Sequence, residues 1–131
     1  MEPAGTDGTG VAGDGRGPAL AQLRRGVLPY CVLAALAAEQ RYGFELVGVL
    51  SDTYGLATSE GTIYPLLSRL RRDGLVATTW RESEAGPPRR YYRLTEAGER
   101  ALAAFRADWR AFRSAVDDLV LAGTREGKDD A

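Results

Sequence analysis

The chain has 131 residues, 17 basic and 18 acidic side chains, a formal net charge of −1, one cysteine and no histidine. This length predicts one small domain, and a single cysteine excludes an internal disulfide framework. Without histidine, a phosphate-binding loop or clustered carboxylates, the sequence favours neither an enzyme nor a cofactor or metal site. No apolar run approaches the roughly 20 residues that span a bilayer, and no secretory signal pattern opens the chain, so a cytoplasmic protein is expected.

The two ends of the chain read as tails. Residues 1–18 contain six glycines, and Val11 is their only large aliphatic side chain. Such a segment cannot bury enough apolar surface to offset its ordering entropy, so residues 1–18 and 123–131 are predicted to be disordered. The tails carry six acids and three bases, which leaves 14 basic and 12 acidic residues between them. The predicted folded part is therefore slightly basic.

Two short helices are predicted first. Over residues 26–40, apolar side chains recur at helical spacing, and Pro29 is tolerated because it would lie near the first turn. Cys31 belongs to this apolar face and is interpreted as a buried, inert thiol. A break at residues 41–43 precedes a second helix over 44–53. Tyr54 and Gly55 then turn the chain.

A third helix is predicted from Ser59, as its N-cap, to Gly74, where it ends. Its core-facing stripe has the i, i+3, i+4, i+7 spacing and consists of Ile63, Leu66, Leu67 and Leu70. The other side is polar and cationic, and carries Gly61, Thr62, Tyr64, Pro65, Ser68, Arg69, Arg71 and Arg72. A major groove accepts one helix, and arginine, threonine and tyrosine can bond to base edges and phosphates. This face predicts a DNA contact, with an ordinary solvated surface as the alternative.

A β-hairpin is predicted next. Strand-like runs at residues 75–82 and 89–94 flank a turn at 85–88 that contains Pro87 and Pro88. An antiparallel pair after a helix-turn-helix is a wing. Arg89 and Arg90 follow the turn, from where they could reach phosphates beside the groove. Residues 59–93 hold seven arginines and four acids, an excess of positive charge that suits a polyanion.

The ordered blocks of this region resemble the PadR family of transcriptional regulators. They are YGFEL at 42–46, GTIYPLL at 61–67, RL at 69–70, GL at 74–75, and RYYRLT at 90–95 followed by Gly98. The resemblance covers about residues 20–122. It implies a winged helix-turn-helix protein that acts mostly as a repressor, dimerises through its C-terminal helix and is often released from DNA by a small molecule. With the exposed face described above, it predicts DNA contacts at Ser59, Thr62, Tyr64, Pro65, Ser68, Arg69, Arg72, Arg89 and Arg90.

The expected fold class is mainly α with a two-stranded β-wing. A winged helix-turn-helix DNA-binding domain would occupy residues 19–95, and a long dimerisation helix would follow over 96–122. Apolar residues recur along this helix at alternating steps of three and four, a heptad seam. At roughly 1.5 Å per residue the helix would be about 40 Å long, more than a small domain covers by itself.

A homodimer is therefore expected, with packing inside one subunit as the alternative. The predicted interface consists of Leu102, Phe105, Trp109, Phe112, Val116 and Leu119. A two-fold dimer would bind double-stranded DNA at an inverted repeat with half-sites about 34 Å apart. In the multidrug-responsive branch of the resembled family, a similarly placed tryptophan lines a ligand pore between subunits. That resemblance implies a site for a flat aromatic effector at Trp109, with Phe105 and Phe112; the alternative is that Trp109 only fills the dimer core.

A second class of function stays open at this point. Winged helices also serve as protein-binding adaptors, and the modest basic excess of this chain does not by itself require DNA. The two hypotheses differ in their dependence on salt. DNA affinity falls steeply as salt rises, because each phosphate contact releases counterions, whereas an adaptor's choice of partner would depend on salt only weakly.

Overall fold

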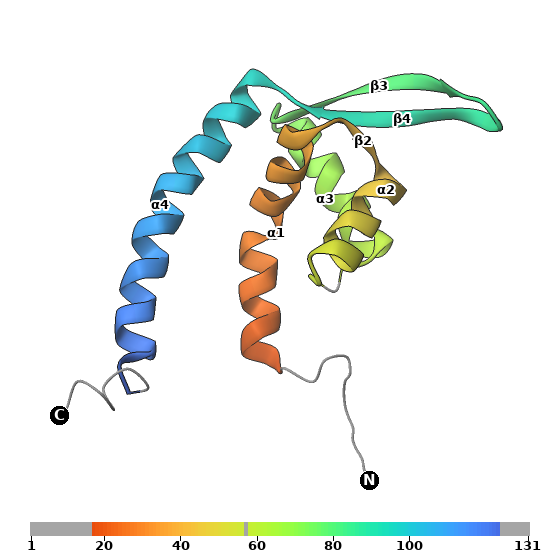
Figure 1. Ribbon diagram of the computed structural model, residues 1–131. Coiled ribbons are helices and arrows are strands. Elements are labelled where there is room, and N and C mark those ends of the chain that lie inside the picture. The colour runs from red at the N-terminus through yellow and green to blue at the C-terminus, as the bar shows by residue number, and fades with distance from the viewer. Residues whose placement is uncertain (1–16, 57, 124–131) are drawn as a thin grey trace, which may run out of the picture.

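The computed structural model describes residues 17–56 and 58–123 (Figure 1). Most of the two predicted tails, residues 1–18 and 123–131, lies outside these ranges. The elements follow the order helix, short strand, two short helical segments, helix, hairpin and long helix. Their bounds are α1 Pro18–Ala38, β2 Arg41–Tyr42, α2 Gly43–Gly48, π-helical η1 Val49–Thr53, α3 Glu60–Arg72, β3 Val76–Ser83, β4 Gly86–Leu94 and α4 Glu96–Val120. Among residues 17–56 and 58–123, none of the helices combines the length and the hydropathy of a membrane-spanning segment.

Helix α1 is longer than its predicted range of 26–40. It begins at Pro18, whose fixed φ angle and missing N–H suit the first helical position. The prediction that Pro29 lies near the first turn is therefore wrong, because Pro29 is in the interior of the helix. The additional turns carry Arg24 and Arg25, two cations that the shorter prediction left outside any element.

The core lies where α1, α2 and α3 meet under a small sheet (Figure 1). The predicted stripe of α3 is confirmed, since Ile63, Leu66, Leu67 and Leu70 are all buried. Helix α3 ends as predicted at Gly74, whose φ of 80° lies in the left-handed region that favours glycine. Burial of one leucine side chain stabilises a fold by about 1.5–3 kcal/mol, so this stripe fixes α3 and exposes its opposite side.

The sheet has three strands rather than the two of the predicted wing. Its order is β2-β4-β3, and both pairs are antiparallel. The added strand, β2, pairs Arg41 with Tyr92 and Tyr42 with Tyr91. A two-residue strand leaves no periodicity in the sequence, which explains why the chain pattern showed only a break at residues 41–43.

The tip of the wing also differs from the prediction. The turn is formed by Glu84 and Ala85, and Gly86, Pro87 and Pro88 belong to β4. Between the pairs Ser83–Gly86 and Arg81–Arg89 the register shifts, with one residue on β3 facing two prolines on β4. Proline is accepted in a strand at a bulge or an open edge, and β2 covers β4 only at Tyr91 and Tyr92. The prolines therefore stiffen the strand rather than the turn.

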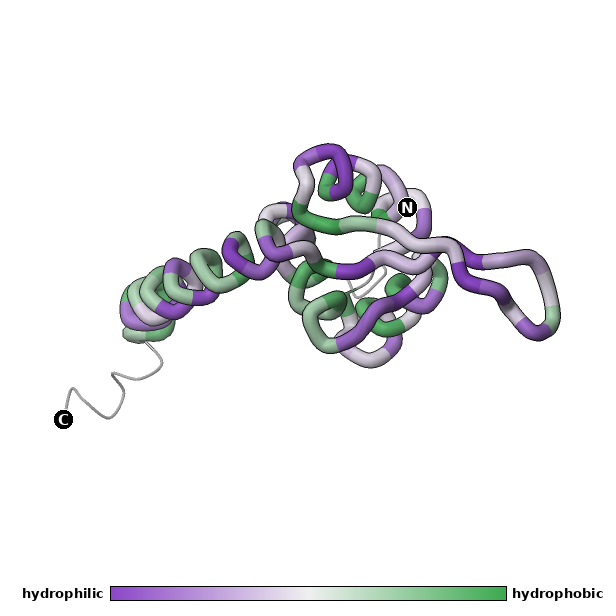
Figure 2. Tube along the Cα trace, turned by 90° about the horizontal axis from the view of Figure 1, so that it is seen from above, coloured by the Kyte–Doolittle hydropathy of each residue, from purple (hydrophilic) through white to green (hydrophobic). Residues whose placement is uncertain are grey.

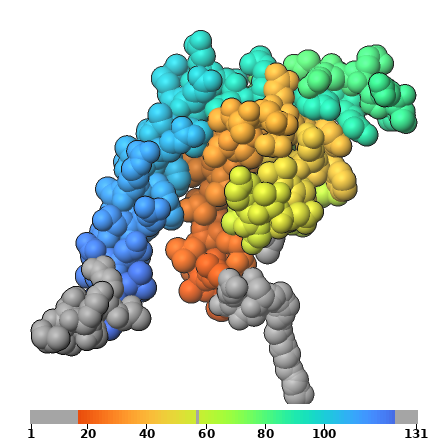
Figure 3. Space-filling view, viewed as in Figure 1, coloured from red at the N-terminus to blue at the C-terminus, as the bar shows by residue number. Residues whose placement is uncertain are grey.

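Helix α4 is anchored at its first turn. Thr95 is the N-cap, and its hydroxyl accepts from the Gly98 N–H at 3.0 Å while donating to the Gly74 carbonyl at 2.7 Å. A side chain at Gly98 would collide with the Leu75 carbonyl and the Leu94 side chain, so glycine permits close packing there. From this anchor α4 runs antiparallel to α1 and separates from it toward its C-terminal end (Figures 1 and 3).

Candidate nucleic-acid interface

The solvent side of α3 gathers most of the predicted DNA contacts. Because the buried stripe turns inward, the other side chains of the helix are exposed, and these include Thr62, Tyr64, Pro65, Ser68, Arg69 and Arg72. Arg69, Arg71 and Arg72 lie in the last turn, and Glu60 is the only acid within the helix. The arrangement presents hydroxyl groups at the N-terminal half and guanidinium groups at the C-terminal half of one exposed surface.

Ser59 occupies the N-cap position of α3, but its side chain does not cap the helix. Its main-chain carbonyl accepts from the Thr62 and Ile63 N–H groups at 3.1 and 2.9 Å. The hydroxyl instead donates weakly to the Thr62 hydroxyl at 3.5 Å. The predicted N-cap position of Ser59 is therefore confirmed, although its side chain makes no capping hydrogen bond, and the two exposed hydroxyl groups form a pair at the start of the helix.

Tyr64 joins α3 to α2. Its ring lies against Gly43 at the start of α2, where any side chain would collide with it. Burial raises the pKa of Tyr64, with smaller contributions in the same direction from Glu60 and Tyr92. The phenol therefore stays protonated at neutral pH and can donate a hydrogen bond to an acceptor such as a phosphate oxygen.

The wing arginines Arg89 and Arg90 lie on opposite faces of the sheet. Neighbouring residues of a strand point to opposite sides, and the register assigns each arginine to its face. The inner face, turned toward the core, includes Val76, Thr78, Trp80, Arg90, Tyr92 and Leu94. The outer face includes Tyr42, Ala77, Thr79, Arg81, Arg89, Tyr91 and Arg93. The structure therefore does not bring Arg89 and Arg90 together.

Each of three wing arginines stacks on an aromatic ring. The guanidinium carbon of Arg81 lies 4.1 Å from the Tyr91 ring centroid, and that of Arg89 lies 4.5 Å from the centroid of Tyr42. On the inner face, the corresponding distance from Arg90 to Trp80 is 5.1 Å. Trp80 is 62% exposed, and the buried Nε of Arg90 has no hydrogen-bond partner. The stacking of the arginines on Trp80 and the two tyrosines was not predicted, although strand alternation would have grouped these residues by face.

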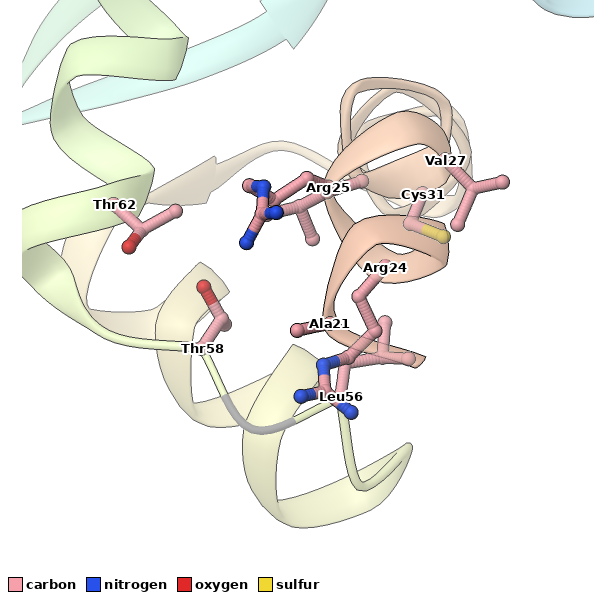
Figure 4. Close-up of a pocket in the computed structure, with 9 residues that line it drawn as sticks. Ala21, Arg24, Arg25, Val27, Cys31, Leu56, Thr58 and Thr62 are labelled. Atoms are coloured by element: carbon pink, nitrogen blue, oxygen red, sulfur yellow. The ribbon is translucent and has the colours of Figure 1, made fainter. Parts of the chain in front are cut away.

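A hollow of about 220 Å³ lies between α1 and the start of α3 (Figure 4). Arg24 and Arg25 line it from α1, and Thr58 and Thr62 line it from the other side. The Arg25 side chain points toward the two threonines (Figure 4), and the buried Thr58 hydroxyl has no hydrogen-bond partner. This places cationic groups beside the N-terminus of α3, an arrangement that the sequence did not predict because the first helix was expected to begin only at residue 26.

The predicted dimer seam on α4 divides into two parts. Leu102 is 3% exposed and belongs to the protomer's own core, so assigning it to the dimer interface is wrong. Phe105 is half-buried and stacks on Tyr30, with ring centroids 3.9 Å apart. Farther along, Trp109, Phe112 and Leu119 are 36%, 57% and 79% exposed. Packing of the whole stripe within one subunit is therefore excluded.

The separated ends of α1 and α4 border an apolar groove of about 540 Å³ (Figure 3). Leu20, Leu23 and Val27 line it from α1, and Trp109, Phe112 and Val116 line it from α4. The ring centroid of Trp109 lies 5.8 Å from that of Phe105 and 6.2 Å from that of Phe112. An aromatic row thus leads from the core at Phe105 to the exposed end of the groove.

Metal binding and thiol chemistry have little support among the described residues. No group of three or more metal-ligating side chains there could hold a metal ion. Cys31 is half-buried, and burial raises the pKa of its thiol, so the reactive thiolate is disfavoured at neutral pH.

The chain is similar to known transcriptional regulators. The profile of the transcriptional regulator PadR-like family matches residues 32–104. A curated relative, the transcriptional regulator Rv3488 of Mycobacterium tuberculosis, is 37% identical over 81 residues, which cover 62% of this chain and 74% of the relative. An uncharacterized protein of Lysinibacillus sphaericus is 26% identical over 101 residues, 76% of this chain and 92% of its own length.

Solved structures show the same similarity. A PadR-like transcriptional regulator from Bacillus cereus matches with a TM-score of 0.70 and 36% identity, covering 76% of this chain and 96% of the other. A PadR family regulator from Eggerthella lenta also matches with a TM-score of 0.70, at 38% identity over 78% of this chain and 88% of the other. Both the winged-helix body and a large part of the sequence pattern are therefore shared.

Proposed function

The chain belongs to the PadR-like family of transcriptional regulators, and we propose that it is a repressor that binds an inverted-repeat operator as a homodimer. The observation that carries this proposal is the exposed side of α3, which carries hydroxyl groups along the helix and three arginines in its last turn while its apolar stripe is buried. Helix α3 would enter the major groove, and the wing would lie against the adjacent backbone.

The side chains of α3 suit two kinds of DNA contact. Arg69 and Arg72 can donate paired hydrogen bonds to guanine or contact phosphates, and both are exposed. Thr62 and Ser68 offer hydroxyl groups, and Tyr64 offers a protonated phenol held in place by Gly43. Ser59 pairs with Thr62 at the helix start, where it could bond to a phosphate.

Homodimerisation is supported by the apolar surface that one subunit leaves uncovered. Trp109, Phe112 and Leu119 are exposed on α4, and the neighbouring groove against α1 is lined largely by apolar side chains. A second copy would cover this surface with the same residues of its own α4 and α1. The two recognition helices would then lie about one DNA turn, roughly 34 Å, apart.

An aromatic effector could bind in the same region. Trp109 lies between Phe105 and Phe112 along the groove, and a flat apolar ligand would stack on an indole ring. Titration of planar cations and phenols, followed by tryptophan emission, tests this part of the proposal. Trp80 also emits, so Trp109→Ala is needed as the control. If no candidate produces a saturable change that depends on Trp109, the aromatic row serves only for packing.

DNA binding is tested by fluorescence anisotropy with the DNA upstream of the protein's own gene, beside a scrambled duplex and across a salt series. The proposal predicts preferential binding as a dimer and a log–log salt slope of about −0.9 for each phosphate neutralised. Arg69→Ala and Arg72→Ala should lower affinity in proteins that remain dimeric. The exposed Arg100 on α4 provides a matched control, and Arg100→Ala should bind as the wild type does. Binding to neither duplex at any salt concentration would favour an adaptor that holds another protein.

A further inference from the structure

The hollow between α1 and the start of α3 combines cationic, hydroxyl and apolar side chains. It lies in the helical body of the protein, from which the wing and α4 extend on opposite sides (Figure 2). Beside its two arginines and two threonines, it is lined by Ala21, Val27, Leu28, Cys31 and Leu56. Among the described residues that line it, none is an aspartate or a glutamate. The hollow therefore suits a molecule with one negatively charged group and a short apolar body.

Arg25 supplies the positive charge that faces such a ligand. Its side chain is exposed, points toward Thr58 and Thr62 (Figure 4), and forms no ion pair within residues 17–56 and 58–123. Arg24 adds a second positive charge to the lining. A guanidinium group presents paired N–H donors in a planar fork, which matches the two oxygens of a carboxylate. A single carboxylate group is therefore the anion that Arg25 fits.

The Thr58 side chain contributes a hydroxyl group whose hydrogen bonding is unsatisfied. Ser51 fixes the main chain of Thr58, because its hydroxyl donates to the Thr58 carbonyl at 2.8 Å and accepts from the Thr58 N–H at 3.3 Å. The buried side-chain oxygen of Thr58 has no hydrogen-bond partner among the described residues, and it points into the space between Arg25 and Thr62 (Figure 4). An unpaired buried hydroxyl is costly to a fold. A carboxylate oxygen beside Arg25 would accept its hydrogen bond.

The volume of the hollow limits the size of the ligand. The hollow measures about 220 Å³, which is less than the roughly 300–1,000 Å³ of sites for drug-sized ligands. The groove between α1 and α4 is larger, about 540 Å³, and its lining includes Trp109 and Phe112 in place of the two threonines. An inorganic anion would leave the apolar lining of the smaller hollow without a partner. A short aliphatic monocarboxylate fits both its volume and its chemistry.

We propose that this hollow binds a short aliphatic monocarboxylate, and that the bound ligand weakens DNA binding by α3. The carboxylate accepts hydrogen bonds from Arg25, Thr58 and Thr62. The hydrocarbon chain lies against Leu28 and Leu56. Thr62 is also one of the proposed DNA contacts, so the ligand places negative charge where a phosphate would bind, and like charges repel. The regulatory half of this inference rests on the DNA-binding function proposed above, whereas the binding of the ligand does not.

Isothermal titration calorimetry of the full-length protein with butanoate, pentanoate and hexanoate, at constant ionic strength, tests the site. Affinity should rise about fourfold with each methylene group that becomes buried. Arg25→Gln should weaken hexanoate binding about tenfold or more, because a charged partner is lost. The exposed Arg100 on α4 gives the control, and Arg100→Gln should bind hexanoate as the wild type does. Hexanamide has the same chain without the charge and should also bind about tenfold more weakly. Hexanoate binding that Arg25→Gln leaves unaltered overturns the inference.

Two further variants locate the ligand. Thr58→Val keeps the shape of the side chain but removes its hydroxyl, and should weaken hexanoate binding about two- to tenfold. It should not lower the thermal stability of the ligand-free protein, because that hydroxyl makes no hydrogen bond to the described residues. Trp109→Ala changes only the groove between α1 and α4 and should leave hexanoate affinity unchanged. Binding that depends on Trp109 and not on Arg25 would place the ligand in that groove and overturn the inference.

The regulatory half is tested by fluorescence anisotropy with the operator duplex, with and without saturating hexanoate, and with sodium chloride to match the ionic strength. Hexanoate should weaken DNA binding by the wild type about fivefold or more, and DNA should weaken hexanoate binding by the same factor. Arg25→Gln should show little response at the same hexanoate concentration. Binding of hexanoate through Arg25 without a change in DNA affinity overturns the regulation and leaves the site standing. Wild-type protein that binds no duplex without the ligand contradicts the DNA-binding function, and calorimetry then still decides the site.

Discussion

Helices α3 and α4 are both amphipathic, but only α3 has its apolar face covered by its own subunit. In α3 the whole stripe is buried, and Ile63 and Leu67 are fully inaccessible. In α4 burial ends after Leu102, and Trp109, Phe112 and Leu119 are exposed, with Val116 half-buried between the last two. An apolar periodicity therefore indicates which face of a helix needs a partner, but not what that partner is. For α3 the partner is the protomer's core, and for α4 we propose a second copy.

The largest effect is expected from shortening one side chain in the buried apolar stripe of α3. Leu67→Ala removes a fully buried side chain and should lower the free energy of unfolding by about 2–5 kcal/mol, through lost burial and the cavity left behind. Urea denaturation measures the change. A loss below about 1 kcal/mol would contradict the tight packing of α3.

A second prediction concerns the close contact at the start of α4. Gly98→Ala forces a side chain against the Leu75 carbonyl and should destabilise the fold by about 1–3 kcal/mol. Gly48→Ala is the matched control, because Gly48 has helical backbone angles and only a distant contact to Asp52. That change should stabilise the protein by about 0.5–1 kcal/mol. Thermal unfolding of both variants shows whether their effects have opposite signs.

Substitutions in the exposed part of α4 should change dimer formation rather than the stability of the fold. Leu119→Asp places a charge on the exposed seam and should raise the dimer dissociation constant at least tenfold, about 1.4 kcal/mol, in sedimentation velocity. Ser114→Asp puts the same charge on the other side of the helix and should leave the dimer intact. Equal effects of the two changes would mean that the seam is not the interface.

The smallest effects on stability are expected at the N-cap residues of α3 and α4. Thr95→Ala removes a hydroxyl that bonds at both 2.7 and 3.0 Å and should cost about 1 kcal/mol of unfolding free energy. Ser59→Ala removes a side chain that does not cap α3, so its effect should stay within about 0.5 kcal/mol. Chemical denaturation of the pair is the measurement. A larger loss of unfolding free energy in Ser59→Ala than in Thr95→Ala would contradict the assignment of the side-chain cap to Thr95.

Much of the fold was predictable because its signals are local. The stripe of α3, its end at Gly74 and the long helix from residue 96 follow from spacing and from glycine's tolerance of positive φ angles. The start of α1 had a local signal as well, since Pro18 precedes further apolar residues, but the interior Pro29 favoured a later start. The α1 residues that pack in the core begin at Leu28, so core packing accounts for the helix around Pro29 but not for its earlier turns.

The family, the order of the helices and the hairpin, and the apolar face of each helix could be predicted from the sequence, because they depend on periodicity and on ordered residue blocks. The tertiary structure sets which surfaces of these elements stay exposed. It buried Leu102 while exposing Phe112, brought Arg25 beside Thr62, and separated Arg89 from Arg90 by strand pairing. These outcomes depend on register and on contacts between residues far apart in the chain, which no local pattern encodes.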